Sequence, residues 1–440
     1  MRRSLLIAAV GAALVVAATK ASAEIEEYSS HVRKGFEDPE PVVSRDGYHF
    51  GSIHREKGRE RLYKDAAMIA EGDAESFSVT EKGAFLDIPS FPAALSGDGG
   101  VLIHTIKSRD ASGVVGWRLG VNGAAKGAVH AKVLSMAVSD HGSNLALSTM
   151  ESGSRFSVFS LAGEGPSFGT PSDLIGVSDD SVLFRAAWNG RYWLYRDNAA
   201  LPNRSYDAVA ASPDLRSIAG VYSDGFGGQA VELNGHSLGS WPEVSKPNFD
   251  GDGHDLIFLA RTSRTAASGT YDAAVVNGSS RAIPPQEPAN GFSPAARPGD
   301  GAPFLAVSQG GKAKLYAAGR MLPEIGDLHR MAHWIAFTRS GSHWAVFVQD
   351  AKGKTDLIVD GQAQEGRFLG PLASTRLVFD TENEYHYLGD SIDGITLICG
   401  ALKGAPSPDG PCVRYGKRLD TAPRFRARDL PDALPAARAQ

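Results

Sequence analysis

One short turn pattern recurs along this 440-residue chain and limits the folds that it can adopt. A small polar residue is followed by Asp and Gly, or by a close variant, and the pattern repeats eight times at a mean spacing of about 42 residues. The turns lie at residues 44–47, 96–99, 139–142, 178–181, 212–214, 250–253, 299–301 and 340–341. A repeat of this length is typical of one four-stranded blade of a β-propeller.

Short apolar segments and a second class of turn follow the Asp/Gly turns. Segments such as 101–103, 182–184 and 256–258 are bounded by turn-forming residues and are too short for helices. The second class is Asn-Gly or Asp-Gly, at residues 122–123, 234–235, 277–278 and 360–361, and it supplies the positive φ angles of tight hairpins. Two turn classes in phase predict an all-β fold, a β-propeller of four-stranded antiparallel blades.

The number of blades follows from the number of repeats and from ring closure. A ninth, degenerate unit spans residues 376–379, 385–388 and 395–399. A closed ring commonly completes one blade with strands from both chain ends, so nine units predict eight blades and allow seven or nine. The propeller is assigned to residues 40–420, after an N-terminal segment at 24–39 and before a flexible C-terminal tail at 421–440.

The repeat resembles that of TolB-like propellers, which are related to WD-repeat propellers. The likeness lies in the order Ser-x-Asp-Gly, apolar strand, polar gap, apolar strand and Asn/Asp-Gly; it is clearest over residues 337–361 and covers roughly 40–405. The resemblance implies a propeller alone. Residues 24–39 leave no room for the helical domain of TolB, and the 41 residues after Cys399 hold no Gly-x-Ser-x-Gly elbow of a hydrolase domain.

The first 23 residues read as a secretory signal peptide. Arg2 and Arg3 precede an apolar run at 5–18, and Ala21-Ser22-Ala23 offers a cleavage site. Fourteen apolar residues rise about 21 Å as a helix, short of the roughly 30 Å of a bilayer core. The sequence therefore predicts a periplasmic or secreted protein without a transmembrane anchor in the mature chain, and leaves open whether the general secretory or the twin-arginine route exports it.

The two cysteines agree with an oxidising compartment. Cys399 ends an apolar strand, Cys412 is expected to open another at 413–415, and a Gly/Pro-rich turn lies between them. Two cysteines that flank a loop in an exported protein are predicted to form a disulfide. A pair of buried thiols is the alternative.

The most ligand-rich stretch runs from Asn248 to Asp255. Asn248, Asp250 and Asp252 occupy positions one, three and five, and Gly253 occupies position six, as in an EF-hand-like calcium loop. The stretch also resembles the calcium loops of FG-GAP propeller repeats, which place a carboxylate at position nine, whereas here Asp255 stands one residue early. The alternative is an ordinary Asp/Gly turn of the sixth repeat. No other cofactor is called for by the sequence.

Histidines and aromatic residues give no single catalytic site. His329 and His333 would stand about 13 Å apart on a strand, too far to share a metal ion. Histidines on different blades could meet only in the folded ring: His54, His104, His130 and His386. Six tryptophans are expected mainly to pack between blades, with a binding face as the alternative. The catalytic residues, if the protein is an enzyme, are unknown from the sequence.

Charge narrows the function classes. The formal net charge is −5 and no basic stripe is present, which argues against nucleic acid as a partner. The favoured hypothesis is an exported cell-envelope propeller that binds a protein or polymer partner through one face. The alternative is a propeller hydrolase or lyase that acts on a polysaccharide or lactone at the channel mouth.

Overall fold

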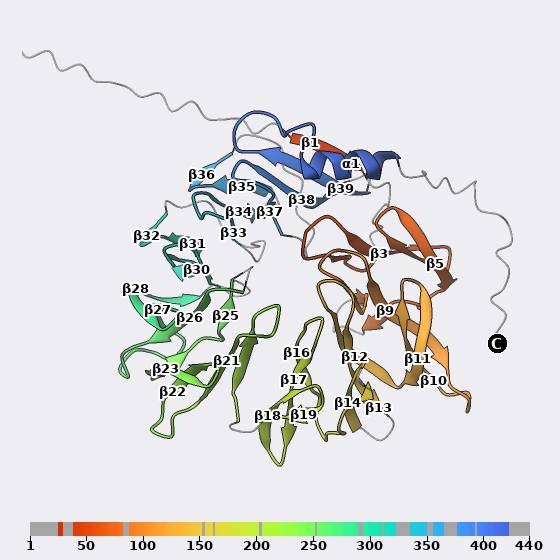
Figure 1. Cartoon of the computed structure of the whole chain (residues 1–440), viewed down its shortest axis with the longest axis horizontal. Helices are drawn as coiled ribbons and strands as arrows, with labels where there is room; N and C mark the ends of the chain where they lie inside the picture. Colours follow the sequence, from red (N-terminus) through yellow and green to blue (C-terminus); the bar gives the residue numbers. More distant parts are fainter. Residues whose placement is uncertain are drawn as a thin grey trace, which may run out of the picture.

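The chain folds into a ring of nine radial blades, as the computed structural model shows (Figure 1). The structure describes residues 25–29, 38–81, 88–151, 155–161, 163–201, 205–250, 253–288, 294–309, 312–322, 335–349, 355–364, 376–391 and 394–421. The predicted signal peptide at 1–23 and the predicted tail beyond Thr421 lie outside these ranges. In each blade the strands run antiparallel, from one near the centre of the ring to one at its rim (Figure 1).

The first three blades follow the chain without interruption except for one insertion. Blade 1 contains β2 (Val42–Val43), β3 (Phe50–Glu56), β4 (Arg59–Lys64) and β5 (Ala67–Asp73). The insertion is a two-stranded arm, β6 (Val79–Glu81) and β7 (Ile88–Ser90). Blade 2 contains β8 (Ala93–Leu95), β9 (Leu102–Arg109), β10 (Val115–Val121) and β11 (Ala124–His130). Blade 3 contains β12 (Lys132–Val138), β13 (Leu145–Glu151), β14 (Arg155–Ser160) and β15 (Gly163–Glu164).

The middle blades keep the same order, and blades 6 and 7 share a strand. Blade 4 contains β16 (Asp173–Val177), β17 (Val182–Trp188), β18 (Arg191–Arg196) and β19 (Ala199–Ala200). Blade 5 contains β20 (Ala208–Ala211), β21 (Ile218–Ser223), β22 (Gln229–Leu233) and β23 (His236–Trp241). Blade 6 has a split inner strand, β24 (Glu243–Val244) and β25 (Asn248–Phe249), followed by β26 (Leu256–Arg261), β27 (Tyr271–Val276) and β28 (Ser279–Pro288). The end of β28 also pairs with β30 of blade 7.

The last blades close the ring. Blade 7 contains β29 (Ala295–Ala296), β30 (Pro303–Gln309), β31 (Lys312–Ala317) and β32 (Arg320–Met321). Blade 8 contains β33 (Ala336–Phe337), β34 (Trp344–Gln349), β35 (Thr355–Val359) and β36 (Gln362–Ala363). Blade 9 contains β37 (Val378–Phe379), β38 (Glu384–Ser391) and β39 (Gly394–Ala401), and its rim strand is the N-terminal β1 (Ile25–Ser29), which pairs with β39.

Nine blades is the upper end of the predicted range, one more than the favoured eight. The prediction of eight assumed that one repeat unit would be divided between the two chain ends. Instead, β1 lies upstream of the first unit and completes the ninth, so every unit forms its own blade. In Figure 1 the red β1 lies beside the blue β39.

The core is divided into layers between neighbouring blades. Phe184 and Ala186 of blade 4 pack against Val158 of blade 3, while Leu183 and Leu194 on the other side of blade 4 pack against blade 5. Because a strand alternates its side chains between two faces, each blade can bury both faces against its neighbours. The ring is therefore held together by burial that no single blade achieves alone.

The segment after the last blade differs from the prediction. Residues 413–415, expected as a strand, belong to the helix α1 (Pro411–Thr421). Pro411 stands at the first helical position, where its missing N–H costs no hydrogen bond and its fixed φ suits a helix. The predicted disulfide between Cys399 and Cys412 is present and ties this helix to β39. Within the described ranges no helix is long and apolar enough to cross a membrane.

Candidate functional site

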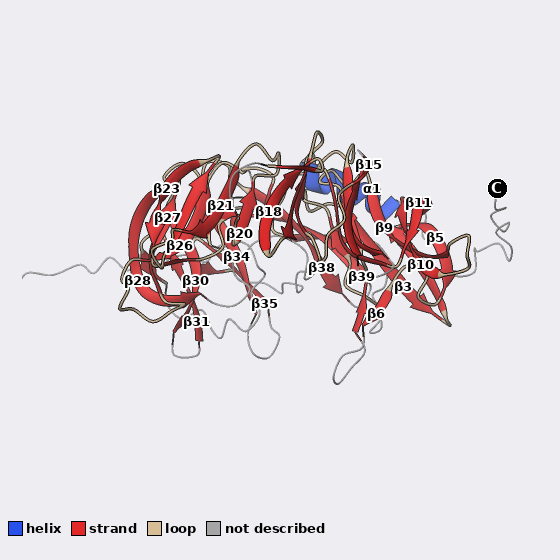
Figure 2. Cartoon of the chain, turned by 90° about the horizontal axis from the view of Figure 1, so that it is seen from below, coloured by secondary structure: helices blue, strands red, loops and turns tan. Residues whose placement is uncertain are grey.

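The ring has two faces that carry different connections. Because the strands of a blade alternate in direction, the turns between first and second strands and between third and fourth strands lie on one side, the turn face. The hairpins between second and third strands lie on the opposite side, the hairpin face. The β6–β7 arm belongs to the hairpin face, since it connects the fourth strand of blade 1 to the first strand of blade 2, and Figure 2 shows it on the side away from α1.

On the turn face, the recurring Ser and Asp side chains stabilise their own turns. The buried Ser96 hydroxyl donates to Asp98 Oδ1 over 2.7 Å and accepts a hydrogen bond from the Val101 N–H at 2.9 Å. The hydrogen bonds from Ser96 and from the Gly100 N–H lower the pKa of Asp98. Ser212 and Asp214 repeat the arrangement in blade 5. The carboxylates of Asp98 and Asp214 therefore stabilise their own turns.

The same turns also join one blade to the next. The Asp46 N–H donates to the Gly97 carbonyl at 3.1 Å, and the Asp98 N–H donates to the Asp140 carbonyl at 3.0 Å. Between blades 8 and 9, the Ser340 and Ser342 hydroxyls donate to Glu382. These hydrogen bonds lower the pKa of Glu382 to about 2. Hydrogen bonds between turns thus join blades 1 and 2, blades 2 and 3, and blades 8 and 9 on the turn face.

The second turn class explains two His–Asp pairs that resemble catalytic dyads. In blade 2, Asn122 has a positive φ of 46° and its Oδ1 accepts the Leu102 N–H at 2.9 Å. Asp65 and Asp360 occupy the same position in blades 1 and 8 and accept the backbone N–H of Phe50 and Trp344. The second oxygen of each carboxylate then meets a histidine: His49 Nδ1 at 3.0 Å from Asp65, and His343 Nδ1 at 2.7 Å from Asp360. These pairs follow the repeat and stabilise hairpins.

The most concentrated polar cluster lies at the seam between blades 9 and 1. Tyr48 stacks on the buried His386 ring at 3.8 Å and donates its hydroxyl to Asp380 over 2.7 Å. His386 Nδ1 lies 2.9 Å from Asp380, and its Nε2 lies 2.8 Å from the Asp46 carbonyl oxygen. Burial and the Asp380 carboxylate raise the pKa of Tyr48. A phenol held protonated in this way is a hydrogen-bond donor and a poor nucleophile.

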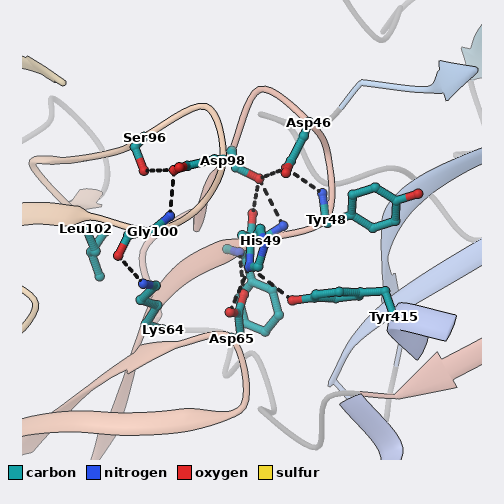
Figure 3. Close-up of polar contacts among 12 residues, drawn as sticks. Asp46, Tyr48, His49, Lys64, Asp65, Ser96, Asp98, Gly100, Leu102 and Tyr415 are labelled. Atoms are coloured by element: carbon teal, nitrogen blue, oxygen red, sulfur yellow. Dashed lines mark hydrogen bonds and ion pairs between the residues drawn. The ribbon is translucent and has the colours of Figure 1, made fainter. Parts of the chain in front are cut away.

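Helix α1 adds a second layer to this seam (Figure 3). Tyr415 reaches back from the helix to His49, with 3.1 Å between its hydroxyl and Nδ1. Its ring lies against Tyr48 and His49 (Figure 3). Burial raises the pKa of Tyr415 as well. The cluster joins blade 1, blade 9 and the helix, so we assign it a role in closing the ring.

The predicted calcium ligands that the structure describes make hydrogen bonds to different partners. Asp250 Oδ1 accepts the N–H groups of His254 at 2.7 Å and Asp255 at 3.1 Å, as an Asp/Gly turn does. Asp255 Oδ1 accepts the side-chain amide of Asn277 at 2.6 Å, and the amide of Asn248 donates to the Pro294 carbonyl. Asp252, the ligand at position five, lies outside the described residues. Calcium binding here stays a prediction.

The histidines on different blades do not converge. His54 pairs with Asp38 at 2.9 Å, and His130 pairs with Glu151 at 2.8 Å. The buried His104 contacts the Thr105 carbonyl through Nδ1. His329 and His333 lie outside the described residues. Among the residues that the structure describes, no three His, Cys, Asp or Glu side chains gather in a way that could hold a metal ion.

The hairpin face carries a feature that the sequence reading missed, a rigid loop with an exposed phenylalanine at its apex. In the loop at 224–228, Asp224 Oδ1 accepts the N–H groups of Phe226 at 2.7 Å and Gly228 at 2.9 Å, and the Asp224 N–H donates to the Gly228 carbonyl. Its Oδ2 accepts the Ser240 hydroxyl at 2.5 Å. Phe226 is nevertheless 81% exposed. In the sequence, this loop is marked only by a single Phe that follows an Asp and stands between two glycines.

Blade 2 builds the same five-residue loop. At 110–114, Asp110 Oδ1 accepts the N–H groups of Ser112 at 2.8 Å and Val114 at 2.9 Å, and the Asp110 N–H donates to the Val114 carbonyl. Val114 is 61% exposed, and Val115 beside it is exposed as well. We call 110–114 and 224–228 the braced loops.

Blade 4 presents aromatic side chains on a tighter hairpin. Asn189 and Gly190 both have positive φ, which fits the two-residue turn between β17 and β18. Trp188, at the end of β17, is 54% exposed, and Tyr192 on β18 is exposed with the Arg185 guanidinium 4.6 Å above its ring centre. Trp188 was expected to pack between blades; it does not.

Exposed apolar side chains therefore concentrate on one face. Of the seven large hydrophobic side chains that the described residues expose, five flank hairpins of this face: Val114, Val115, Trp188, Tyr192 and Phe226. Burial of apolar area is the main driving force of association, so these side chains on blades 2, 4 and 5 are the candidate contact groups of the hairpin face. We define the apolar rim as these five residues.

The nearby arm is also anchored firmly. The buried Glu60 carboxylate accepts the backbone N–H groups of Phe77 at 2.8 Å and Ser78 at 3.2 Å, and Arg55 Nε donates to it at 3.1 Å. The segment that leads into β6 is thereby fixed to blade 1. The arm and the apolar rim share the hairpin face.

Comparison with known proteins finds only distant likenesses, all of them to solved structures. No protein-family model and no curated protein matches the sequence. Similar solved structures include BamB from Moraxella catarrhalis, at 13% identity and a TM-score of 0.36 over 86% of this chain and 99% of that one. They also include the β-propeller domain of the Trilobed protease from Pyrococcus furiosus, at 10% identity and a TM-score of 0.35 over 66% of this chain and 97% of that one. Both TM-scores lie below 0.5, so the assignment of the fold rests on the strand pairing described above.

Proposed function

We propose that this protein is an exported β-propeller of the cell envelope that binds a protein or polymer partner through its hairpin face. The observation that supports the proposal is the apolar rim, in which Phe226 and Val114 stand exposed on loops that are already hydrogen-bonded into shape. Exposing apolar side chains to water is unfavourable in free energy, and burying them against a partner removes that penalty. Loops that are already ordered lose little conformational entropy on binding. Propellers are suited to this role because many loops project from one rigid disc.

The compartment is part of the same proposal. Residues 1–23 have the composition of a signal peptide, and the disulfide between Cys399 and Cys412 suits an oxidising compartment outside the cytoplasm. The alternative of a hydrolase or lyase at the channel mouth has no specific observation in its favour among the described residues. The His–Asp pairs of blades 1 and 8 and the Tyr48–Asp380–His386 cluster stabilise turns and the seam of the ring.

A capture experiment tests the proposal. Immobilised mature chain (24–440) is incubated with envelope extract, alongside the double variant Trp188→Ser/Phe226→Ser and the control Leu161→Ser, which removes a 66% exposed leucine from the turn face. We expect the same partner with the wild type and the control, and at least about tenfold less with the double variant, a change of about 1.4 kcal/mol. Equal recovery by the double variant, or no partner at all, would overturn the proposal.

Calcium is proposed separately for residues 248–255. The oxygen-bearing side chains at positions one, three and five support it. Calorimetric titration of the mature chain with calcium should show binding that Asp252→Asn weakens at least tenfold, with Asp214→Asn in the neighbouring blade as the control. Absence of heat, or equal binding by both variants, would assign the stretch to the turn alone.

A further inference from the structure

Helix α1 lies over the seam where the ring closes and contacts each part that meets there. It packs against both β1 and β39 of blade 9 (Figure 1). The buried Cys412 and Val413 belong to an apolar cluster that also contains Phe50 of blade 1 and residues of β39. Tyr415, one helical turn after Cys412, reaches His49 of blade 1. The helix therefore covers the joint between the first blade and the last.

The disulfide attaches this helix at the point where β1 joins the sheet. In the strand register, Cys399 stands opposite Glu26 of β1 on one side and opposite His386 of β38 on the other. Its bond to Cys412 therefore connects α1 to the middle strand of these three, directly beside the strand that closes the ring. A single covalent bond thus links the terminal helix to the terminal strand pair.

Both terminal elements depend on tertiary contacts for their stability. β1 has five residues and is the outermost strand of its sheet, so it pairs on one edge with β39. A helix as short as the eleven residues of α1 is marginal in water without packing. Short edge strands and terminal helices are the segments that open first by local unfolding. Because β1 and α1 pack against each other, a constraint on the helix restrains the opening of the strand.

We propose that α1 is a latch on the seam of the ring, and that formation of the Cys399–Cys412 bond closes it. With the bond formed, α1 stays docked and holds β1 against β39. With two thiols instead, α1 undocks more often, β1 leaves the sheet, and the edge of β39 is exposed. The proposal concerns the closure of the chain itself, so its failure would leave the proposed binding function untouched.

The closing reaction is a thiol–disulfide exchange with a disulfide oxidant, for which oxidised glutathione serves as the probe. The thiolate of one cysteine attacks a sulfur of the oxidant, which forms a mixed disulfide and releases one thiol. The thiolate of the second cysteine attacks the mixed disulfide, which forms the Cys399–Cys412 bond and releases the second thiol. Two protein thiols are oxidised, one oxidant disulfide is reduced, and the two cysteine protons end on the two released thiols.

Burial of the bond keeps the latch closed once it has formed. An attacking thiolate must reach one of the two sulfurs, and both Cys399 and Cys412 are buried in the folded chain. Reduction therefore has to wait until α1 undocks. Opening of the seam and loss of the bond are coupled, each favouring the other.

Hydrogen exchange followed by mass spectrometry tests the latch on the mature chain (24–440) without a substitution. The chain oxidised with glutathione disulfide is compared with the same chain folded and kept in reductant. We expect the amides of β1 to exchange at least about tenfold faster in the reduced chain. The control is β23, the rim strand of blade 5, which opens by its own fraying and should exchange alike in both states. Equal exchange of β1 in the two states, or an equal increase in β23, would overturn the proposal.

Removal of the helix separates its part from that of the bond. A chain of residues 24–410 lacks α1, and a chain of residues 24–421 keeps it. We expect β1 to exchange in 24–410 as fast as in the reduced mature chain, and in oxidised 24–421 as slowly as in the oxidised mature chain. Slow exchange of β1 in 24–410 would show that α1 does not hold the strand. The comparison of redox states needs no truncation, so it decides the question even if 24–410 does not fold.

The rate at which dithiothreitol reduces the bond in the folded chain tests the docking of the helix. Tyr415→Ala removes the contact with His49 and should speed reduction at least about tenfold, because α1 undocks more often. Tyr192→Ala removes an exposed tyrosine of blade 4 and should reduce at the wild-type rate. If both variants were reduced as slowly as the wild type, the Tyr415 contact would not hold the helix and the latch as proposed would be wrong.

Discussion

At the scale of single residues, Gly99 shows how closely the turns of neighbouring blades fit together. It adopts a φ of +68°, and a Cβ placed on it would lie 2.0 Å from the His49 ring of the preceding blade. Gly58, in the hairpin of blade 1, has a φ of +78° but nothing within 4 Å. The two glycines share the conformational requirement and differ only in the space around them.

We therefore predict that Gly99→Ala destabilises the protein by about 2 kcal/mol more than Gly58→Ala. Both substitutions carry the cost of about 1 kcal/mol for a side chain at positive φ, and only Gly99→Ala adds the cost of overpacking between blades. Urea unfolding followed by tryptophan fluorescence measures the difference. Equal destabilisation by the two variants would show that the contact between Gly99 and His49 can widen without a loss of stability.

His104 gives a prediction about pH. Burial lowers its pKa to about 4, and its hydrogen bonds fit the neutral ring, with Nδ1 at 3.1 Å from the Thr105 carbonyl and Nε2 accepting the Gly123 N–H. Between pH 6.5 and 4, His104 is protonated in the unfolded chain and neutral in the folded chain. The contribution of His104 to the free energy of unfolding is therefore complete above pH 6.5 and is lost as the pH falls to 4.

From pH 7 to pH 4, the wild type should lose about 3 kcal/mol more than His104→Gln, which cannot titrate. Other groups, including His49 and His54 with their raised pKa values, titrate in both proteins and cancel in the comparison. The measurement is urea unfolding at several pH values. Parallel pH profiles for the two proteins would mean that His104 is protonated in the folded state.

At the scale of elements, the regular repeats were predictable and the exceptions were not. Asn122 and Asn277 mark hairpins because positive φ is a local property of these residues, and the hairpins lie where predicted. Tyr415 is predicted in a strand because Val413-Arg414-Tyr415 alternates apolar and charged residues, and a run this short fits either a strand or a helix. Its place in α1 depends on contacts with a distant blade. The apolar rim was missed for the same reason, because exposure of Phe226 is a tertiary property.

The disulfide that attaches α1 to β39 should contribute about 3 kcal/mol, the chain-entropy value for a loop of this length, with Cys399 and Cys412 separated by 13 positions. Cys399→Ala/Cys412→Ala should therefore lower the thermal midpoint, as should dithiothreitol added to the wild type. The reductant should leave the double variant unchanged, which is the internal control. A wild type indifferent to reduction would mean that the buried contacts of Cys412 and Val413 hold the helix unaided.

At the scale of the whole molecule, the ring is closed by a strand that comes from the far end of the sequence. β1 pairs with β39 over five residues, from Ile25 opposite Gly400 to Ser29 opposite Thr396. All eight residues of β39 are buried. The seam is further covered by α1 and by the Tyr48–His386 stack. Without β1, the most buried strand of blade 9 would become an unpaired edge.

A chain that spans residues 31–440 should therefore be less stable than 24–440 by about 5 kcal/mol, at about 1 kcal/mol for each paired residue lost, and should self-associate through the open edge of β39. Urea unfolding and light scattering measure the two effects. A synthetic peptide of residues 24–30 should restore both by pairing with the vacant edge, whereas a peptide of the same composition in scrambled order should not. A chain ending at residue 421 controls for truncation as such. If 31–440 remained monomeric and as stable as 24–440, β1 would contribute nothing measurable to stability. The ring would then be held closed by the packing between blades and by the hydrogen bonds between turns.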